Sequence, residues 1–141
     1  MILRIDTESS TPVYAQIVDR IKRAIASGIL ANGDSLPSLR ELALKLRINP
    51  LTVNKAYKHL ENEGLIETRH GLGSFVAANA RSSTEKFRRE TLTRATDDLL
   101  VDAFQMGVSF DEVKELLEER IEAAKDDFAR DLSQRRDEGD K

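Results

Sequence analysis

In the first half of the chain, hydrophobic residues recur at intervals of three and four positions in three successive segments. This spacing is typical of helices that bury one face and expose the other. The segments run from Thr11-Pro12 to Gly28, from about 39 to 46, and from Asn49-Pro50 to about 62. We therefore expect three amphipathic helices, with buried stripes that include Val13, Ile17, Ile21 and Ile25 in the first and Val53, Ala56, Tyr57 and Leu60 in the third.

The second and third segments begin with residues that cap helices. Ser38 precedes the second segment and has Glu41 three positions later, which is the spacing of a capping box. Asn49 and Pro50 make a similar start for the third, because Asn caps helices and proline fits their first turn. Only about three residues separate the two segments. Two helices joined by so short a connection predict a helix-turn-helix.

After Gly64 the hydrophobic spacing changes to that of short strands. Residues 65–68 and 74–77 flank a turn in which Gly71 and Gly73 can supply the positive φ angles of a tight hairpin. A β-hairpin wing is therefore expected directly after the helix-turn-helix. We assign residues 10–78 to one winged helix-turn-helix domain.

The remainder of the chain is predicted to be helical. Residues 79–84 are small and polar, and we expect them to form a linker. Helical spacing then resumes in two segments, the second of which begins at Ser109. We assign residues 85–132 to a two-helix domain and expect the charged residues 133–141 to be disordered.

Two amphipathic helices cannot bury both apolar stripes against each other and complete a core alone. Pairing with a second copy would cover the stripes, so we expect a symmetric homodimer. The fold class is thus mainly α with a small β-hairpin wing, followed by a two-helix dimerisation domain. The predicted dimer contacts are Leu92, Leu99, Ala103, Phe110, Val113, Leu117, Ile121 and Phe128.

Composition narrows the classes of protein. The 141 residues are 33% charged and contain no apolar run long enough to span a membrane. The N-terminus lacks the features of a secretory signal, so we expect a cytoplasmic protein without a membrane partner. The absence of cysteine excludes disulfides and thiolate sites, and two histidines are too few to suggest a metal site. We expect no cofactor.

Charge is unevenly distributed. Residues 1–80 hold ten Lys/Arg and eight Asp/Glu, for a net charge of +2, whereas residues 81–141 hold twelve and seventeen, for a net charge of −5. The overall net charge of −3 therefore arises in the second part. The first part is free to meet the phosphates of a nucleic acid.

The predicted third helix has an outward face opposite its buried stripe. In a helix-turn-helix this helix enters the DNA major groove, with its N-terminal residues nearest the bases. Asn pairs with adenine, apolar groups contact the thymine methyl, and Lys binds guanine or phosphate. Leu51 could instead be a tolerated surface residue or pack on the second helix, and the lysines could form a solvated face. At about 100° per residue, the outward positions are Leu51, Lys55, Lys58 and Asn62, flanked by Thr52 and Asn54.

Helix N-termini attract phosphate, so we expect contacts near Ser38 and Asn49. Arg40 lies in the first turn of the second helix, where it could bind phosphate or a groove edge. Its alternative is a salt bridge to Glu41 or Asp34.

The hairpin could insert its tip into the minor groove or press on the DNA backbone, since its glycines allow close approach. An ordinary hairpin turn is the alternative. The candidate residues of this wing are Arg69, His70, Gly71 and Gly73.

The stretch LPSLRELALKLRINPLTVNKAYKHLENEGLIETRHGLGSFVA closely resembles the winged helix-turn-helix of the GntR family. The resemblance implies a homodimer that binds a palindromic operator in double-stranded DNA, usually as a repressor. The short helical second part resembles the YtrA-like subfamily, in which it mediates dimerisation. Position 51 is often polar in the family but is Leu here. The contacts that carry over by position are Ser38, Arg40, Asn49, Leu51, Thr52, Asn54, His70 and Gly71.

Other classes of function are less well supported by the sequence. No catalytic triad, phosphate-binding loop or pair of buried carboxylates occurs at a suitable spacing, so we do not expect an enzyme. A winged helix used for protein contact or for architectural DNA binding is the remaining alternative. A small-molecule effector is conceivable, although two helices enclose little volume until a partner supplies walls.

Overall fold

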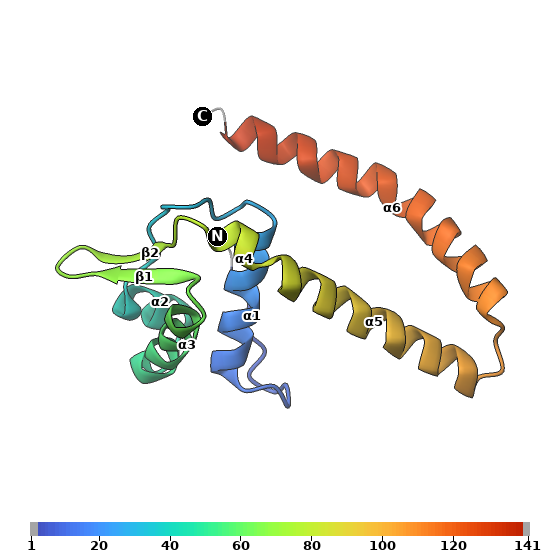
Figure 1. Ribbon diagram of the computed structural model, residues 1–141, viewed down its shortest axis with the longest axis horizontal. Helices are drawn as coiled ribbons and strands as arrows, with labels where there is room; N and C mark the ends of the chain where they lie inside the picture. Colours follow the sequence, from blue (N-terminus) through green and yellow to red (C-terminus); the bar gives the residue numbers. More distant parts are fainter. Residues whose placement is uncertain (1–2, 140–141) are drawn as a thin grey trace. The chain divides into compact units, whose positions relative to one another are not determined.

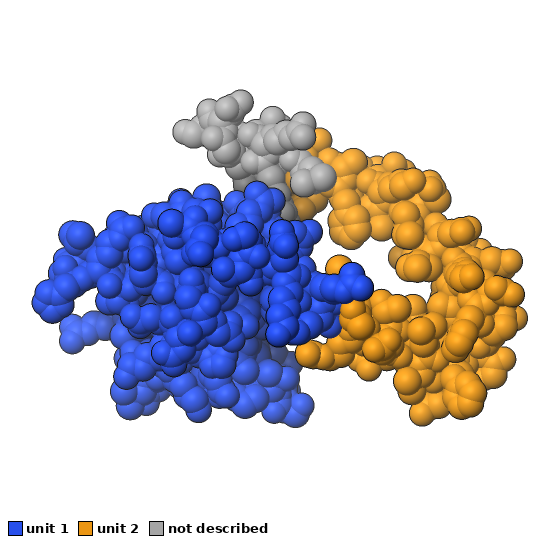
Figure 2. Space-filling view, in the orientation of Figure 1, with its two compact units in different colours: residues 1–91 blue, residues 92–141 orange. Residues whose placement is uncertain are grey.

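The computed structural model describes residues 3–139 and confirms a mainly helical fold with a β-hairpin after the helix-turn-helix (Figure 1). The chain forms two compact units, Met1–Thr91 and Leu92–Lys141 (Figure 2). In chain order the elements are α1 (Val13–Ala26), α2 (Leu39–Leu46), α3 (Pro50–Asn62), β1 (Ile66–Arg69), β2 (Gly73–Val76), α4 (Ala80–Ser83), α5 (Glu85–Gln105) and α6 (Phe110–Gly139).

The core of the first unit lies between α1, α2 and α3. Many of its fully buried side chains come from the stripes that the hydrophobic spacing predicted, including Ile17, Ile21, Val53 and Leu60, and Val76 of β2 adds to them. At the start of α2 the Ser38 hydroxyl accepts a hydrogen bond of 3.1 Å from the backbone N–H of Glu41, as the capping-box spacing predicted. These contacts hold α2 and α3 as a helix-turn-helix.

Tyr57 joins α3 to the segment that leads into α2. Its hydroxyl donates a hydrogen bond of 2.8 Å to the backbone carbonyl of Pro37. Burial raises the pKa of Tyr57, and the negative charge of Glu41 adds to the effect. The phenol therefore stays neutral and keeps its proton as a donor.

The wing has the predicted hairpin and one additional pairing that the sequence did not predict. Strands β1 and β2 are antiparallel, with Arg69 opposite Gly73, and Gly71 and Gly73 have positive φ angles of 75° and 108°. Ser35 forms an isolated bridge with Phe75, and the Leu36 N–H donates to the Ser74 carbonyl at 2.8 Å. The chain before α2 thus fixes the wing to the helical core.

Residues 79–84, which their composition predicted to be a linker, include a short helix. Residues Ala80–Ser83 form α4, and both Ala80 and Thr84 are fully buried. The Thr84 hydroxyl donates to the Arg81 carbonyl at 2.6 Å, which satisfies its polar group inside the unit. Small residues whose side chains hydrogen-bond to nearby backbone occur both in packed turns and in exposed loops. Composition alone does not distinguish a packed turn from a loop.

In the second unit, α5 and α6 are joined by a tight turn. The Val108 N–H donates to the Ala103 carbonyl at 2.8 Å, and the Ser109 hydroxyl caps α6 by accepting from the Glu112 N–H at 3.2 Å. Ala103 and Val113 are buried at this turn. None of the helices in the described part of the chain has the length and apolar character needed to cross a bilayer.

Helix α6 is longer than predicted. It continues to Gly139, whereas we expected disorder from residue 133 onward. Gln, Arg and Glu have good helix propensity, so a charged end can extend an existing helix. Residues 140 and 141 of the expected tail lie outside the described residues.

We expect Tyr57→Phe to lower the free energy of unfolding by about 1 kcal/mol, because it leaves the Pro37 carbonyl without its donor. Urea unfolding of the full chain would measure this. Tyr14→Phe is the matched control, since the Tyr14 hydroxyl has no hydrogen-bond partner among residues 3–139, and it should change stability by less than about 0.5 kcal/mol. Equal effects of the two variants would contradict the role of the Tyr57 hydroxyl.

Candidate nucleic-acid interface

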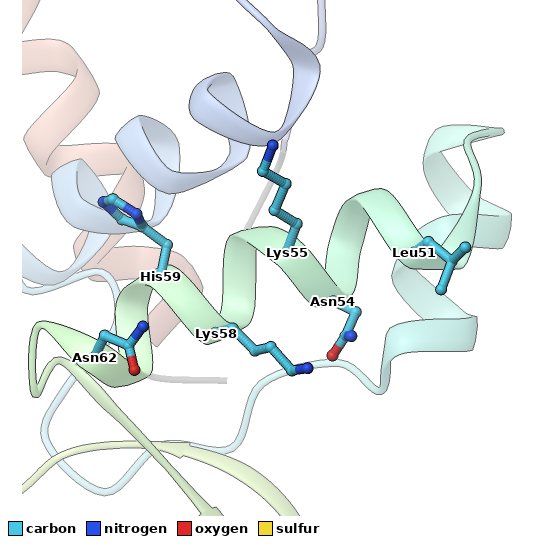
Figure 3. A pocket seen from close by; sticks show the side chains of 6 residues that line it. All are labelled: Leu51, Asn54, Lys55, Lys58, His59 and Asn62. Atoms are coloured by element: carbon cyan, nitrogen blue, oxygen red, sulfur yellow. The ribbon is translucent and has the colours of Figure 1, made fainter.

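The outward face of α3 forms an open depression of about 420 Å³ (Figure 3). The opposite face of the helix, with Val53, Ala56 and Leu60, is fully buried, so the helix is anchored on one side and uncovered on the other. The structure thereby brings together five residues that the helical spacing placed on or beside the outward face, and it adds His59, which the spacing did not select. The lining residues are Leu51, Asn54, Lys55, Lys58, His59 and Asn62.

Leu51 is 72% exposed in the first turn of α3. It therefore does not pack against α2, which was one alternative to a binding role. Thr52 and Asn54 flank it and are half-buried. The N-terminal turn of α3 thus offers an apolar side chain and two hydrogen-bonding side chains within four consecutive positions.

Asn49 has a structural role at the N-terminus of α3. Its side-chain oxygen accepts a hydrogen bond of 2.9 Å from the backbone N–H of Leu51. This bond orients the side chain and leaves the amide NH₂ group as a donor. A predicted contact residue is therefore also the cap of the helix.

Arg40 projects from the first turn of α2 without an ion pair to any described residue. The predicted alternative, a salt bridge with Asp34 or Glu41, is absent within residues 3–139. The Asp34 carboxylate instead accepts from the Ala31 N–H at 2.8 Å. The Arg40 guanidinium is exposed and available for an anion.

The two lysines of α3 differ in their surroundings. The Lys55 ammonium lies 4.1 Å from the centre of the Tyr14 ring, and Figure 3 shows its side chain extending toward α1. Such cation–π contacts hold an ammonium group in place without neutralising its charge. Lys58 extends from the other side of the helix, and within the described residues it has no partner. Lys58 is therefore the freer of the two cations.

His59 is tied to the C-terminal end of α3. Its Nε2 lies 3.0 Å from the carboxylate of Glu63, which also pairs with Lys22. In the described part of the chain, no group of three or more His, Cys, Asp or Glu side chains could hold a metal ion.

The tip of the wing is exposed, whereas Arg69 beside it contacts side chains of the two strands. His70, Gly71 and Leu72 form the exposed connection between β1 and β2. The Arg69 guanidinium lies 4.3 Å from the centre of the Phe75 ring and donates to Glu67 at 3.1 Å. The sequence placed Arg69 at the wing but could not predict that its charge is partly engaged there.

The net charge of the whole chain conceals a local excess of positive charge around α3. Residues 42–60, which span most of α2, the turn and most of α3, contain four Lys/Arg and no Asp/Glu, although the whole chain has a net charge of −3. The N-terminus of α3 adds its own partial positive charge. This segment, which lies between Glu41 and Glu61, therefore has a local excess of positive charge. The four cations are Lys45, Arg47, Lys55 and Lys58.

The predicted dimer contacts fall into two groups. Ala103 and Val113 are used inside the protomer, where they pack at the turn between α5 and α6. The other six are large hydrophobic side chains that are exposed. So many exposed hydrophobic side chains on one pair of helices are unusual in a monomer. These six, named here the apolar stripe, are Leu92, Leu99, Phe110, Leu117, Ile121 and Phe128.

Comparison with known proteins gives consistent matches. Residues 13–76 match the family described as "Bacterial regulatory proteins, gntR family". The chain is 40% identical over 118 residues to the HTH-type transcriptional repressor YtrA of Bacillus subtilis, covering 84% of this chain and 91% of that protein.

Solved structures agree with these matches. A GntR family transcriptional regulator from Listeria monocytogenes has a TM-score of 0.69 and 30% identity, covering 79% of this chain and 97% of that one. YtrA from Sulfolobus acidocaldarius, a GntR-family transcription factor, has a TM-score of 0.54 and 43% identity, covering 69% and 99%.

We expect Asn49→Ala to lower the free energy of unfolding by about 1 kcal/mol, because the first turn of α3 loses its cap. Asn49→Ser should retain most of the stability, since Ser caps equally well. Asn62→Ala removes the same group at the other end of α3, where it caps nothing, and is the matched control. Chemical denaturation that showed no difference between Asn49→Ala and Asn62→Ala would disprove the capping role.

Proposed function

This chain belongs to the GntR family of bacterial regulatory proteins, in its YtrA-like group, and we propose that it is a repressor that binds a palindromic operator as a homodimer. It is a DNA-binding transcriptional regulator by family membership. The palindromic arrangement of the operator, the homodimer and the repressor activity are our inferences. Repression is favoured because the similar YtrA of Bacillus subtilis is a transcriptional repressor.

One observation carries the proposed function: α3 is buried along one face and uncovered along the other, and its uncovered face begins at a capped N-terminus. A helix held in this way can enter a major groove without rearrangement of the core. We assign base contacts to Thr52, Asn54 and Leu51, since they occupy the first turns. Lys58 and Arg40 are assigned to the phosphates, because both are exposed and unpaired within the described residues.

The remaining predicted contacts have supporting roles in this proposal. Ser38 and Asn49 cap their helices and present N-termini to phosphate. Lys55, held over Tyr14, contributes charge beside the groove. The wing residues Arg69, His70, Gly71 and Gly73 would lie against the DNA backbone or minor groove.

The apolar stripe supports the homodimer. Exposed side chains such as Phe128, at 66%, and Leu92, at 68%, are costly to leave in water and pair naturally with an identical surface. A two-fold axis would set two recognition helices about 34 Å apart, one turn of DNA. Such a dimer matches an operator with two inverted half-sites. Binding to chromosomal DNA would require a cytoplasmic location.

Selection of binding sites from random duplexes, followed by gel shift with the selected and a scrambled duplex, tests the proposed function. We expect an inverted repeat and clear preference for the selected sequence. Equal binding to both duplexes would favour architectural DNA binding. Absence of binding to either would favour the alternative of protein contact.

Thr52→Ala and Asn54→Ala should each weaken binding to the selected duplex by roughly 1–3 kcal/mol and relax the choice of base at one position. Lys58→Ala should instead weaken binding to selected and scrambled DNA alike, with a salt slope lower by about one, because it removes a phosphate contact. Titration at several salt concentrations would separate these patterns. Equal losses on both duplexes for Thr52→Ala would rule out base recognition by that residue.

Leu117→Glu should convert the dimer to a monomer and reduce operator affinity, because it places a carboxylate in the apolar stripe. Ala123→Glu adds the same group off the stripe on the same helix and should leave the dimer intact. Light scattering of the full-length variants would report the mass. A Leu117→Glu protein that remained dimeric would place the interface elsewhere.

A further inference from the structure

Arg47 has an unusual backbone conformation in the turn between α2 and α3. Its φ and ψ angles of 56° and 48° are left-handed, and among the described residues it is the one non-glycine residue with positive φ. This conformation costs free energy for most residues that carry a Cβ atom, including arginine, whereas glycine adopts it freely and asparagine adopts it more readily than arginine. Replacement of Arg47 by glycine would therefore remove this conformational free-energy cost.

The other helices of this protein that end in the same way use glycine. Gly28 follows α1 with φ of 83°, Gly64 follows α3 with φ of 75°, and Gly107 follows α5 with φ of 71°. Among the described residues with positive φ, the turn of the helix-turn-helix alone has a long, charged side chain instead. The exception coincides with the candidate interface.

The fold gives no reason for this side chain. The backbone of the turn is bonded through the Arg47 N–H, which donates to Leu44, and through the Ile48 N–H, which donates to Ala43 at 3.0 Å. Glycine could make the same backbone bonds. The Arg47 side chain is exposed, and it has no hydrogen bond or ion pair with any residue of the described range.

The surroundings favour an anion. Arg47 precedes Asn49, the cap of α3, by two positions, and it lies within residues 42–60, which contain no Asp or Glu. When the N-terminus of α3 enters a major groove, the turn before it comes to the edge of that groove, where the phosphates run. A guanidinium group binds phosphate oxygens through two parallel hydrogen bonds.

We propose that Arg47 is an additional contact to the DNA backbone, and that the chain retains a strained arginine in this turn because its side chain holds a phosphate diester beside the recognition helix. The assignment rests on the proposed function, since it needs a duplex at the N-terminus of α3. It adds a residue that neither the motif nor the hydrophobic pattern selected. Backbone strain of this kind is commonly retained at functional sites.

Three full-length variants test the assignment. Arg47→Gly and Arg47→Asn both suit the left-handed conformation and remove the charge, whereas Arg47→Lys keeps the charge and the Cβ atom. Each is measured by urea unfolding and by binding to the selected and the scrambled duplex at several salt concentrations. Circular dichroism would confirm that each variant is folded before binding is compared.

We expect Arg47→Gly and Arg47→Asn to raise the urea midpoint and yet to weaken binding to both duplexes by a similar factor, with a salt slope lower by about one. Arg47→Lys should keep the wild-type slope. A gain in stability accompanied by a loss of binding would be difficult to explain by damage to the fold.

Two results would overturn the assignment alone. One is an unchanged affinity and salt slope in folded Arg47→Gly and Arg47→Asn, and the other is a loss confined to the selected duplex, which would indicate base recognition. A rival role is a favourable interaction of the cation with the dipole of α2. That role requires a lower urea midpoint without a change in salt slope. Wild-type protein that bound no duplex would instead refute the proposed function.

Discussion

The burial of one face of α3 is the constraint on which the rest of the structure depends. Val53, Ala56 and Leu60 are fully removed from water, and Tyr57 adds a hydrogen bond to the segment before α2. Each of these contacts fixes the rotation of the helix about its axis. Because the buried face is fixed, the opposite face with Leu51, Asn54 and Lys58 is fixed as well, and it remains open to a partner. The hydrophobic core thus determines which side chains of α3 remain exposed.

Features with a local cause could be predicted from the sequence. The three- and four-residue spacing gave the helices, the capping residues Ser38 and Asn49 gave their starts, and the glycines of the hairpin gave its turn. Features with a distant cause could not. The bridge of Ser35 with Phe75 joins residues forty positions apart, and the contact of Lys55 with Tyr14 joins two helices. The sequence that flanks one residue of such a pair does not indicate which distant residue it contacts.

The same distinction holds for the candidate site. The exposed face of α3 follows from the helical period. The residues predicted to face outward therefore lie together along one depression in the structure. Whether a charged side chain is paired or free depends on its neighbours in space, and the sequence alone could not predict this. Arg69 is engaged with Phe75 and Glu67, whereas Arg40 is free within the described residues. Burial of Ala80 and Thr84 in the supposed linker was missed for the same reason, since small polar residues suit both a loop and a packed turn.

The contrast between a negative chain and its positive residues 42–60 has a consequence for the encounter with DNA. At long range a duplex meets the field of the net charge, whereas beside α3 it meets a segment with four cations and no carboxylate. Salt shortens both effects over a Debye length of about 8 Å under physiological conditions. The attraction therefore acts only at short range, and it depends on which side of the protein faces the duplex.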